Sequence, residues 1–91
     1  MQLSILEEYF LQASDRLPEE AQRVLSVLLN DGNMNKEELS LTSQVKRAVL
    51  DHVVMQLYAL GFVEVSTEGK SKICGFTRLG EEYFNLLKQA G

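Results

Sequence analysis

Apolar residues recur at helical spacing along most of the chain, and the clearest pattern covers residues 43–60. At 100° per residue, six apolar positions of this stretch fall on one broad arc: Val49, Leu50, Val53, Val54, Leu57 and Leu60. The pattern predicts one helix over residues 43–60, capped by Thr42 or Ser43, with this arc buried. Gly61 follows at once and predicts where the helix ends.

The residues after this helix have the pattern of a hairpin and a further helix. Val63 and Val65 flank Glu64, which is the alternation of a half-buried strand. Gly69 supplies a turn residue that tolerates positive φ, so a return strand is expected to complete a hairpin over residues 62–76. A C-terminal helix is expected over residues 77–90, with Thr77 as its cap.

Three helical segments precede the long helix. Residues 2–14 predict an N-terminal helix, and a second helix is expected to begin near Pro18 and end near Asn30. The sequence leaves open whether the first helix packs on its own domain or pairs with a second subunit. The expected fold class is mainly α with a small β-hairpin.

A short third helix is expected over residues 36–40. Asn35 stands three residues before Glu38, which is the spacing of a capping box at a helix start. Leu39 and Leu41 are the expected core contacts of this helix. It leads directly into the long helix, so the two form a helix-turn-helix pair.

Length and composition favour one soluble domain over residues 1–91, since 91 residues supply a single modest core. No run of about 18 apolar residues is present, so no membrane span or membrane partner is expected. The N-terminus lacks the basic region of a signal peptide. The single cysteine, Cys74, excludes an internal disulfide and favours a reducing compartment. Together these features predict a cytoplasmic protein.

The charge is unevenly distributed. The net charge is −4, which argues against a nucleic-acid partner if it is taken alone. Residues 36–78, however, carry six bases and five acids, a balance of +1, whereas the rest of the chain carries three bases and eight acids, a balance of −5. The central part is therefore less acidic than the ends, as expected of a DNA-binding face on an acidic body.

Two motifs resemble those of winged-helix regulators. Leu57-Tyr58-Ala59-Leu60-Gly61-Phe62-Val63 is similar to the segment that leaves the recognition helix and enters the wing. Phe76-Thr77-Arg78-Leu79-Gly80 resembles the wing exit of MarR-like and PadR-like transcription regulators. Their separation matches that family over about residues 17–87. The resemblance implies a winged helix-turn-helix core over residues 17–80, with extra N-terminal and C-terminal helices.

The resemblance also implies a DNA-binding site. In this family the second helix of the pair enters the major groove, so residues 43–60 would be the recognition helix and residues 62–76 the wing. Gln44 would bond adenine, Arg47 guanine, and Asp51 would accept from cytosine. Lysines of the short helix and the wing would pair with phosphates. The implied DNA-binding residues are Lys36, Ser43, Gln44, Lys46, Arg47, Asp51, His52, Lys70 and Lys72.

Two functions are consistent with these patterns. The first is a sequence-specific transcription regulator that binds double-stranded DNA as a homodimer. The alternative is a winged-helix protein–protein interaction module without DNA binding, which would use a surface at Met55 and Tyr58. Asp51 also has a second interpretation, because it stands four residues after Arg47 and can form an ion pair with it.

Catalysis and cofactor binding are not expected. The chain has one histidine and one cysteine, without a nucleophile–base pair or a metal-ligand cluster. No glycine-rich phosphate loop follows a strand. The sequence therefore predicts neither an enzyme, nor a cofactor, nor a metal site.

Overall fold

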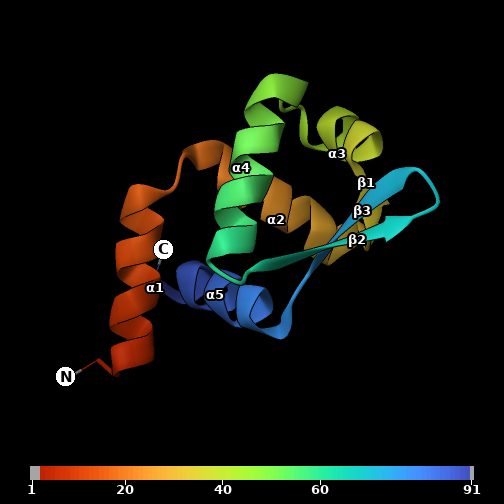
Figure 1. The fold of residues 1–91 in the computed structure, drawn as a ribbon. Coiled ribbons are helices and arrows are strands. Elements are labelled where there is room, and N and C mark those ends of the chain that lie inside the picture. The colour runs from red at the N-terminus through yellow and green to blue at the C-terminus, as the bar shows by residue number, and fades with distance from the viewer. Residues whose placement is uncertain (1–2, 91) are drawn as a thin grey trace.

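The computed structural model describes residues 3–90, which form five helices and a three-stranded sheet (Figure 1). The predicted class is confirmed: the fold is mainly helical, and a hairpin follows the long helix as the wing of a winged helix-turn-helix. In chain order the elements are α1 (Ile5–Arg16), α2 (Glu19–Asp31), β1 (Met34–Asn35), α3 (Lys36–Ser43), α4 (Arg47–Ala59), β2 (Val63–Glu68), β3 (Ser71–Phe76) and α5 (Arg78–Ala90).

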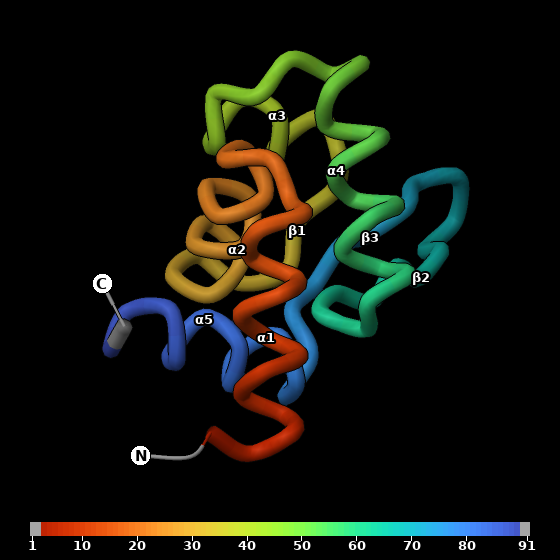
Figure 2. Tube along the Cα trace, turned by 90° about the vertical axis from the view of Figure 1, so that its left-hand side faces the viewer, coloured from red at the N-terminus to blue at the C-terminus, as the bar shows by residue number. Residues whose placement is uncertain are grey.

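The helices α2, α3 and α4 pack around the centre of the molecule, and the other elements surround them. The β2–β3 hairpin projects to one side, whereas α1 lies on the opposite side (Figure 1). Turning the molecule shows α1 running past α2, α4 and α5 (Figure 2). Along its three principal axes the molecule measures 47 × 21 × 21 Å, so it is elongated.

Side-chain caps explain two helix starts. Ser4 and Glu7 form a capping box, in which each side chain accepts from the other residue's backbone N–H at 3.1 Å. Asn35 caps α3, because its Oδ1 accepts from the backbone N–H of Glu38 at 2.8 Å. The predicted cap at Asn35 is confirmed. The predicted start of the first helix at Gln2 lies outside the described residues, and α1 begins at Ile5.

The sheet contains one strand more than the hairpin alone. β1 pairs antiparallel with β3, so the strand order is β1-β3-β2 and β3 is central. Cys74 lies opposite Met34 on one side and Val65 on the other. β1 was not predicted from the sequence, because two residues are too few to show an alternating pattern.

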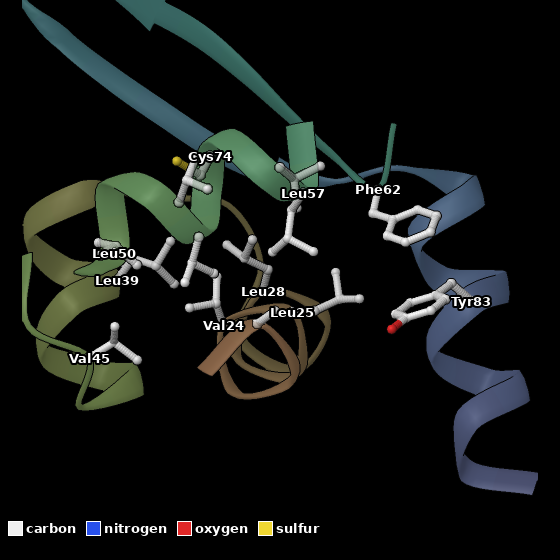
Figure 3. Close-up of a cluster of buried hydrophobic side chains, with 14 of the residues drawn as sticks. Val24, Leu25, Leu28, Leu39, Val45, Leu50, Leu57, Phe62, Cys74 and Tyr83 are labelled. Carbon is white, nitrogen blue, oxygen red and sulfur yellow. The ribbon is translucent and has the colours of Figure 1, made fainter. Parts of the chain in front are cut away.

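One buried cluster joins all five helices. The largest fully buried side chains are Tyr83, Phe62, Leu25, Leu28, Leu39, Leu50, Leu57, Val24, Val53 and Cys74 (Figure 3). The rings of Phe62 and Tyr83 stack with their centroids 4.3 Å apart, and Phe10 of α1 packs edge-on against Tyr83 at 5.5 Å. This aromatic group therefore ties α1 and α5 to the residue that leads into the wing.

The predicted helix over residues 43–60 was wrong at its start. α4 begins at Arg47, whereas Ser43 ends α3 and is buried, with its hydroxyl donating to the carbonyl of Leu39 at 2.6 Å. Gln44 then adopts a left-handed conformation, with φ of 58°. This turn directs Val45 into the core, and a change of backbone direction of this kind leaves no trace in the apolar pattern.

Two predicted core positions are also wrong. Leu41 is 76% exposed, because it stands 200° around α3 from the buried Leu39. Val49 is 38% exposed, since it lies at the edge of the predicted arc on α4. Leu50, Val53, Val54 and Leu57 are buried as predicted.

The two motifs that carry the family resemblance contact each other at the base of the wing. The Thr77 hydroxyl donates to the carbonyl of Gly61 at 2.6 Å, and the backbone N–H of Thr77 donates to the carbonyl of Phe62 at 3.1 Å. The same hydroxyl accepts from the backbone N–H of Gly80 at 3.0 Å and so caps α5. A Cβ at Gly80 would collide with the carbonyl oxygen of Phe62, so glycine is required for this approach.

We expect Thr77→Val to lower the free energy of unfolding by about 1–2 kcal/mol, because it removes the cap of α5 and the bond to Gly61. Thr77→Ser keeps the hydroxyl and is expected to stay within about 0.5 kcal/mol of the parent protein. Urea denaturation followed by circular dichroism measures both changes. Equal losses for the two variants would show that the hydroxyl contributes nothing.

Candidate nucleic-acid interface

Four basic side chains from three parts of the fold surround one cleft of about 410 Å³. Lys36 comes from the start of α3, Arg47 from the start of α4, and Lys70 and Lys72 from the wing. The full lining is Asn35, Lys36, Glu37, Arg47, Asp51, Lys70, Ser71 and Lys72, and we call it the basic cleft. The structure therefore brings together Lys36, Arg47, Asp51, Lys70 and Lys72 from the sequence-predicted site.

Asp51 forms ion pairs with two of these bases. Its Oδ1 lies 3.2 Å from Nζ of Lys36 and 3.5 Å from Nε of Arg47. The hydrogen bond from Lys36, followed by its charge and the contact with Arg47, holds the pKa of Asp51 below the usual value of an aspartate. Asp51 is therefore a carboxylate at neutral pH, and it links α3 to α4.

The remaining predicted site residues are distributed differently. Lys46 precedes α4 at its N-cap position, and His52 is on α4; both are exposed. Gln44 is exposed but lines another cavity of about 410 Å³, together with residues of α2 and Phe84 of α5. The prediction that Ser43 faces a DNA groove was wrong, because its side chain is buried.

Three lining residues of the basic cleft were not among the predicted site residues: Asn35, which was predicted only as a helix cap, Glu37 and Ser71. Glu37 and Ser71 carry no motif, and they join the cleft only because α3 and the wing tip face each other. The ion pair between Lys36 and Asp51 was also missed, because it joins two helices. The pair between Arg47 and Asp51 was anticipated from their spacing within one helix.

A second surface is apolar. α1 and the C-terminal half of α4 form a groove of about 300 Å³, which we call the apolar groove. Its lining comprises Tyr9, Gln12, Ala13, Arg16, Leu17, Gln56, Ala59 and Leu60. Met55 and Tyr58 of α4 are 69% and 56% exposed. The C-terminal half of α4 is therefore apolar on its outer side, in contrast with the charged N-terminal half.

Two further features concern metals and membranes. Within residues 3–90, no group of three or more histidine, cysteine, aspartate or glutamate side chains is arranged to hold a metal ion. None of the helices in this described part has the length and apolar character needed to cross a bilayer.

The fold is shared with several solved structures, one of which was solved with bound DNA. TubR bound to 24 bp of tubC, from Bacillus thuringiensis serovar israelensis pBtoxis, superposes with a TM-score of 0.77 at 21% identity, over 100% of both chains. A MarR family transcriptional regulator from Silicibacter pomeroyi gives 0.78 at 19% identity, over 92% of this chain and 57% of that one. RV1404 from Mycobacterium tuberculosis superposes with a TM-score of 0.77 at 17% identity, over 93% of this chain and 60% of the RV1404 chain.

These likenesses confirm the winged-helix fold. The chain spans less than two thirds of the length of the regulator from Silicibacter pomeroyi and of RV1404, whereas it matches TubR from end to end. TubR is a protein of type III plasmid segregation. No protein-family model matches the sequence, and a comparison with curated protein sequences gives no match either.

We expect NMR titration to place the pKa of Asp51 below that of an ordinary aspartate, and Lys36→Met to raise it because the largest stabilising contact is lost. Since the folded-state pKa is depressed, the pair stabilises the fold at neutral pH, and this contribution is lost as the pH falls through that lowered pKa. Lys70→Met is the matched control from the same cleft and should leave the Asp51 titration unchanged. A titration that is insensitive to Lys36→Met would contradict the ion pair.

Proposed function

We propose that the chain is a sequence-specific DNA-binding protein that regulates transcription, with α4 in the major groove and the β2–β3 hairpin as the wing beside it. The observation that carries the proposal is the basic cleft, in which four cations from α3, α4 and the wing converge beside the exposed N-terminal half of α4. We take residues 1–91 as one winged-helix domain, since side chains of all five helices share one buried cluster.

The charges of the cleft fit a phosphate backbone. It contains four bases and two acids, a balance of +2, although the whole chain carries −4. Lys70 and Lys72 are exposed on the wing, and Lys36 stands at the start of α3. Lysines in such positions pair with phosphates and orient a protein on the duplex without reading its sequence.

The N-terminal half of α4 supplies candidates for base contacts. Arg47 is its first residue and is exposed, so its guanidinium can reach guanine O6 and N7 in the major groove. Ala48 and His52 are exposed on the same helix, and Ala48 is small enough for close approach. Lys46 and Gln44 precede the helix and remain proposed contacts from the turn.

The structural comparisons support a duplex as the partner. TubR, which matches the whole chain, was solved on 24 bp of DNA, and the regulator from Silicibacter pomeroyi belongs to a transcription-regulator family. A protein partner in place of DNA would use the exposed Met55 and Tyr58, which lie on the other half of α4.

Plasmid segregation is a second candidate function. It is favoured by the end-to-end match with TubR, whereas the transcription regulators match over little more than half of their length. The two functions share DNA binding and differ in its consequence. If the chain is a transcription regulator, the protein should repress a reporter gene whose promoter contains its selected binding sequence. If it is a segregation protein, the same sequence placed on a plasmid should improve retention of that plasmid.

We expect the protein to shift a duplex carrying its selected sequence, with an affinity that falls steeply between 50 and 200 mM salt. Lys70→Ala and Lys72→Ala should each flatten the plot of log K against log salt by about 0.9 per lost phosphate contact. Lys88→Ala on α5 is the matched control, because Lys88 packs over the Phe84 ring away from the cleft, and it should leave the slope unchanged. Absence of any shift at low salt would favour a protein partner.

We also propose that the chain forms a homodimer through α1. Leu3, Ile5, Leu6 and Tyr9 are 44%, 85%, 49% and 39% exposed, and this apolar surface continues into the apolar groove. An antiparallel pair of α1 helices would bring the acidic first turn of one helix toward Arg16 at the end of the other. Such a two-fold pair presents two recognition helices to one duplex.

We expect Ile5→Glu to convert a dimer into a monomer in sedimentation-velocity experiments, because it places a charge in the proposed interface. Ile5 is 85% exposed, so the substitution should not unfold the protein. Leu41→Glu is the matched control, since Leu41 is 76% exposed on α3, and it should remain dimeric. Monomeric parent protein at micromolar concentration would exclude this dimer.

A further inference from the structure

Asp51 is an acidic residue in the one surface that is proposed to face a polyanion. Its side chain is 50% exposed on α4, and it lines the basic cleft. A carboxylate in this position repels phosphates and lowers the affinity for any duplex. Its contacts with Lys36 and Arg47 indicate which benefit offsets this loss of affinity.

The contacts of Asp51 restrain Arg47 through one particular nitrogen. Oδ1 of Asp51 lies 3.5 Å from Nε of Arg47, and within residues 3–90 this is the one hydrogen bond or ion pair that the Arg47 side chain makes. Nε carries a single N–H, whereas the two terminal amino groups carry the other four donors of the guanidinium. A restraint at Nε therefore leaves the terminal donors available for a bidentate contact with guanine.

The restraint is itself anchored outside α4. The same Oδ1 lies 3.2 Å from Nζ of Lys36, whose side chain is 20% exposed at the start of α3. The cap at Asn35 fixes this end of α3. Lys36 and Asp51 thus form a chain of contacts that reaches Arg47 from a second helix.

We infer that Asp51 is a positioning residue for sequence recognition, which gives up non-specific affinity and gains discrimination by holding Arg47 through Nε. The inference rests on the proposed function and extends it, because it assigns a role to an acid that contributes nothing to phosphate binding. A restrained arginine loses less side-chain freedom when it binds guanine, and it is less free to form phosphate contacts on the wrong sequence.

Glu37 provides a matched control within the same cleft. It is exposed, it lines the cleft beside Lys36, and within the described residues it makes no ion pair. Asp51→Ala and Glu37→Ala each remove one negative charge from the cleft. If Asp51 acts by charge alone, the two variants behave alike.

The first experiment uses the free protein and does not depend on DNA. In 15N-edited NMR spectra, the Nε–H proton of Arg47 should exchange with water more slowly in the parent protein than in Asp51→Ala, and Glu37→Ala should match the parent protein. Equal exchange in all three proteins would show that the restraint is absent in solution and would overturn the inference.

The second experiment measures discrimination. A duplex is selected from a random pool with the parent protein, and binding to it is compared with binding to a scrambled duplex at fixed salt. Asp51→Ala should tighten binding to the scrambled duplex and reduce the specific-to-scrambled ratio by about two- to threefold, the size expected for an exposed ion pair within one helix, whereas Glu37→Ala should tighten both and leave the ratio unchanged. An unchanged ratio for Asp51→Ala would overturn the inference while leaving DNA binding intact.

Arg47→Lys separates positioning from a direct contact of Asp51 with cytosine. Lysine keeps the charge but lacks the guanidinium fork, so Asp51→Ala in the Arg47→Lys protein should cause no further loss of discrimination. A further loss of similar size would show that Asp51 reads a base itself and would overturn the positioning role. Failure to select any duplex would overturn the proposed function, and this inference with it.

Discussion

The position of the wing depends on the short stretch of backbone where Gly61 and Phe62 approach Thr77 and Gly80. Two hydrogen bonds from Thr77 reach the carbonyls of Gly61 and Phe62, and the absence of a side chain at Gly80 allows the approach. The Phe62 ring then stacks on Tyr83 and locks the same segment to α5. The end of α4 and both ends of the hairpin are thereby fixed to one another, so the lysines of the wing are held at a set distance from Arg47.

Electrostatics organises the opposite end of α4. A chain with a net charge of −4 needs its bases gathered if it is to bind a polyanion, and three separate elements supply them to the basic cleft. The acid among them, Asp51, bonds to both Lys36 and Arg47, so part of the positive charge is already compensated before a ligand arrives. Charge alone therefore gives only part of the attraction, and a partner of the cleft must also place its hydrogen-bonding groups where the basic side chains can reach them.

The sequence was sufficient for those parts of the fold that follow from periodicity and local chemistry. Neighbouring residues were enough to predict the buried positions Leu50, Val53, Val54 and Leu57 of α4, although not the exposed Val49, and the cap at Asn35. The two motifs at the wing base also consist of adjacent residues, and the structure confirms their place there. The start of α4 was not predictable in this way, because the left-handed Gln44 and the buried Ser43 depend on the packing of Val45. The pairing of β1 with β3 and the contact of Lys36 with Asp51 join segments that are distant in sequence, so no local pattern reports them.

The division of α4 into a charged half and an apolar half has a mechanical consequence. Thirteen helical residues at 1.5 Å each form a stiff rod of about 20 Å, with the basic cleft at one end and the apolar groove at the other. A rod of this kind transmits a tilt applied at one end to the other end without bending. A neighbour that packs against Met55 and Tyr58 would therefore contact the same rigid helix that carries Arg47 at its other end.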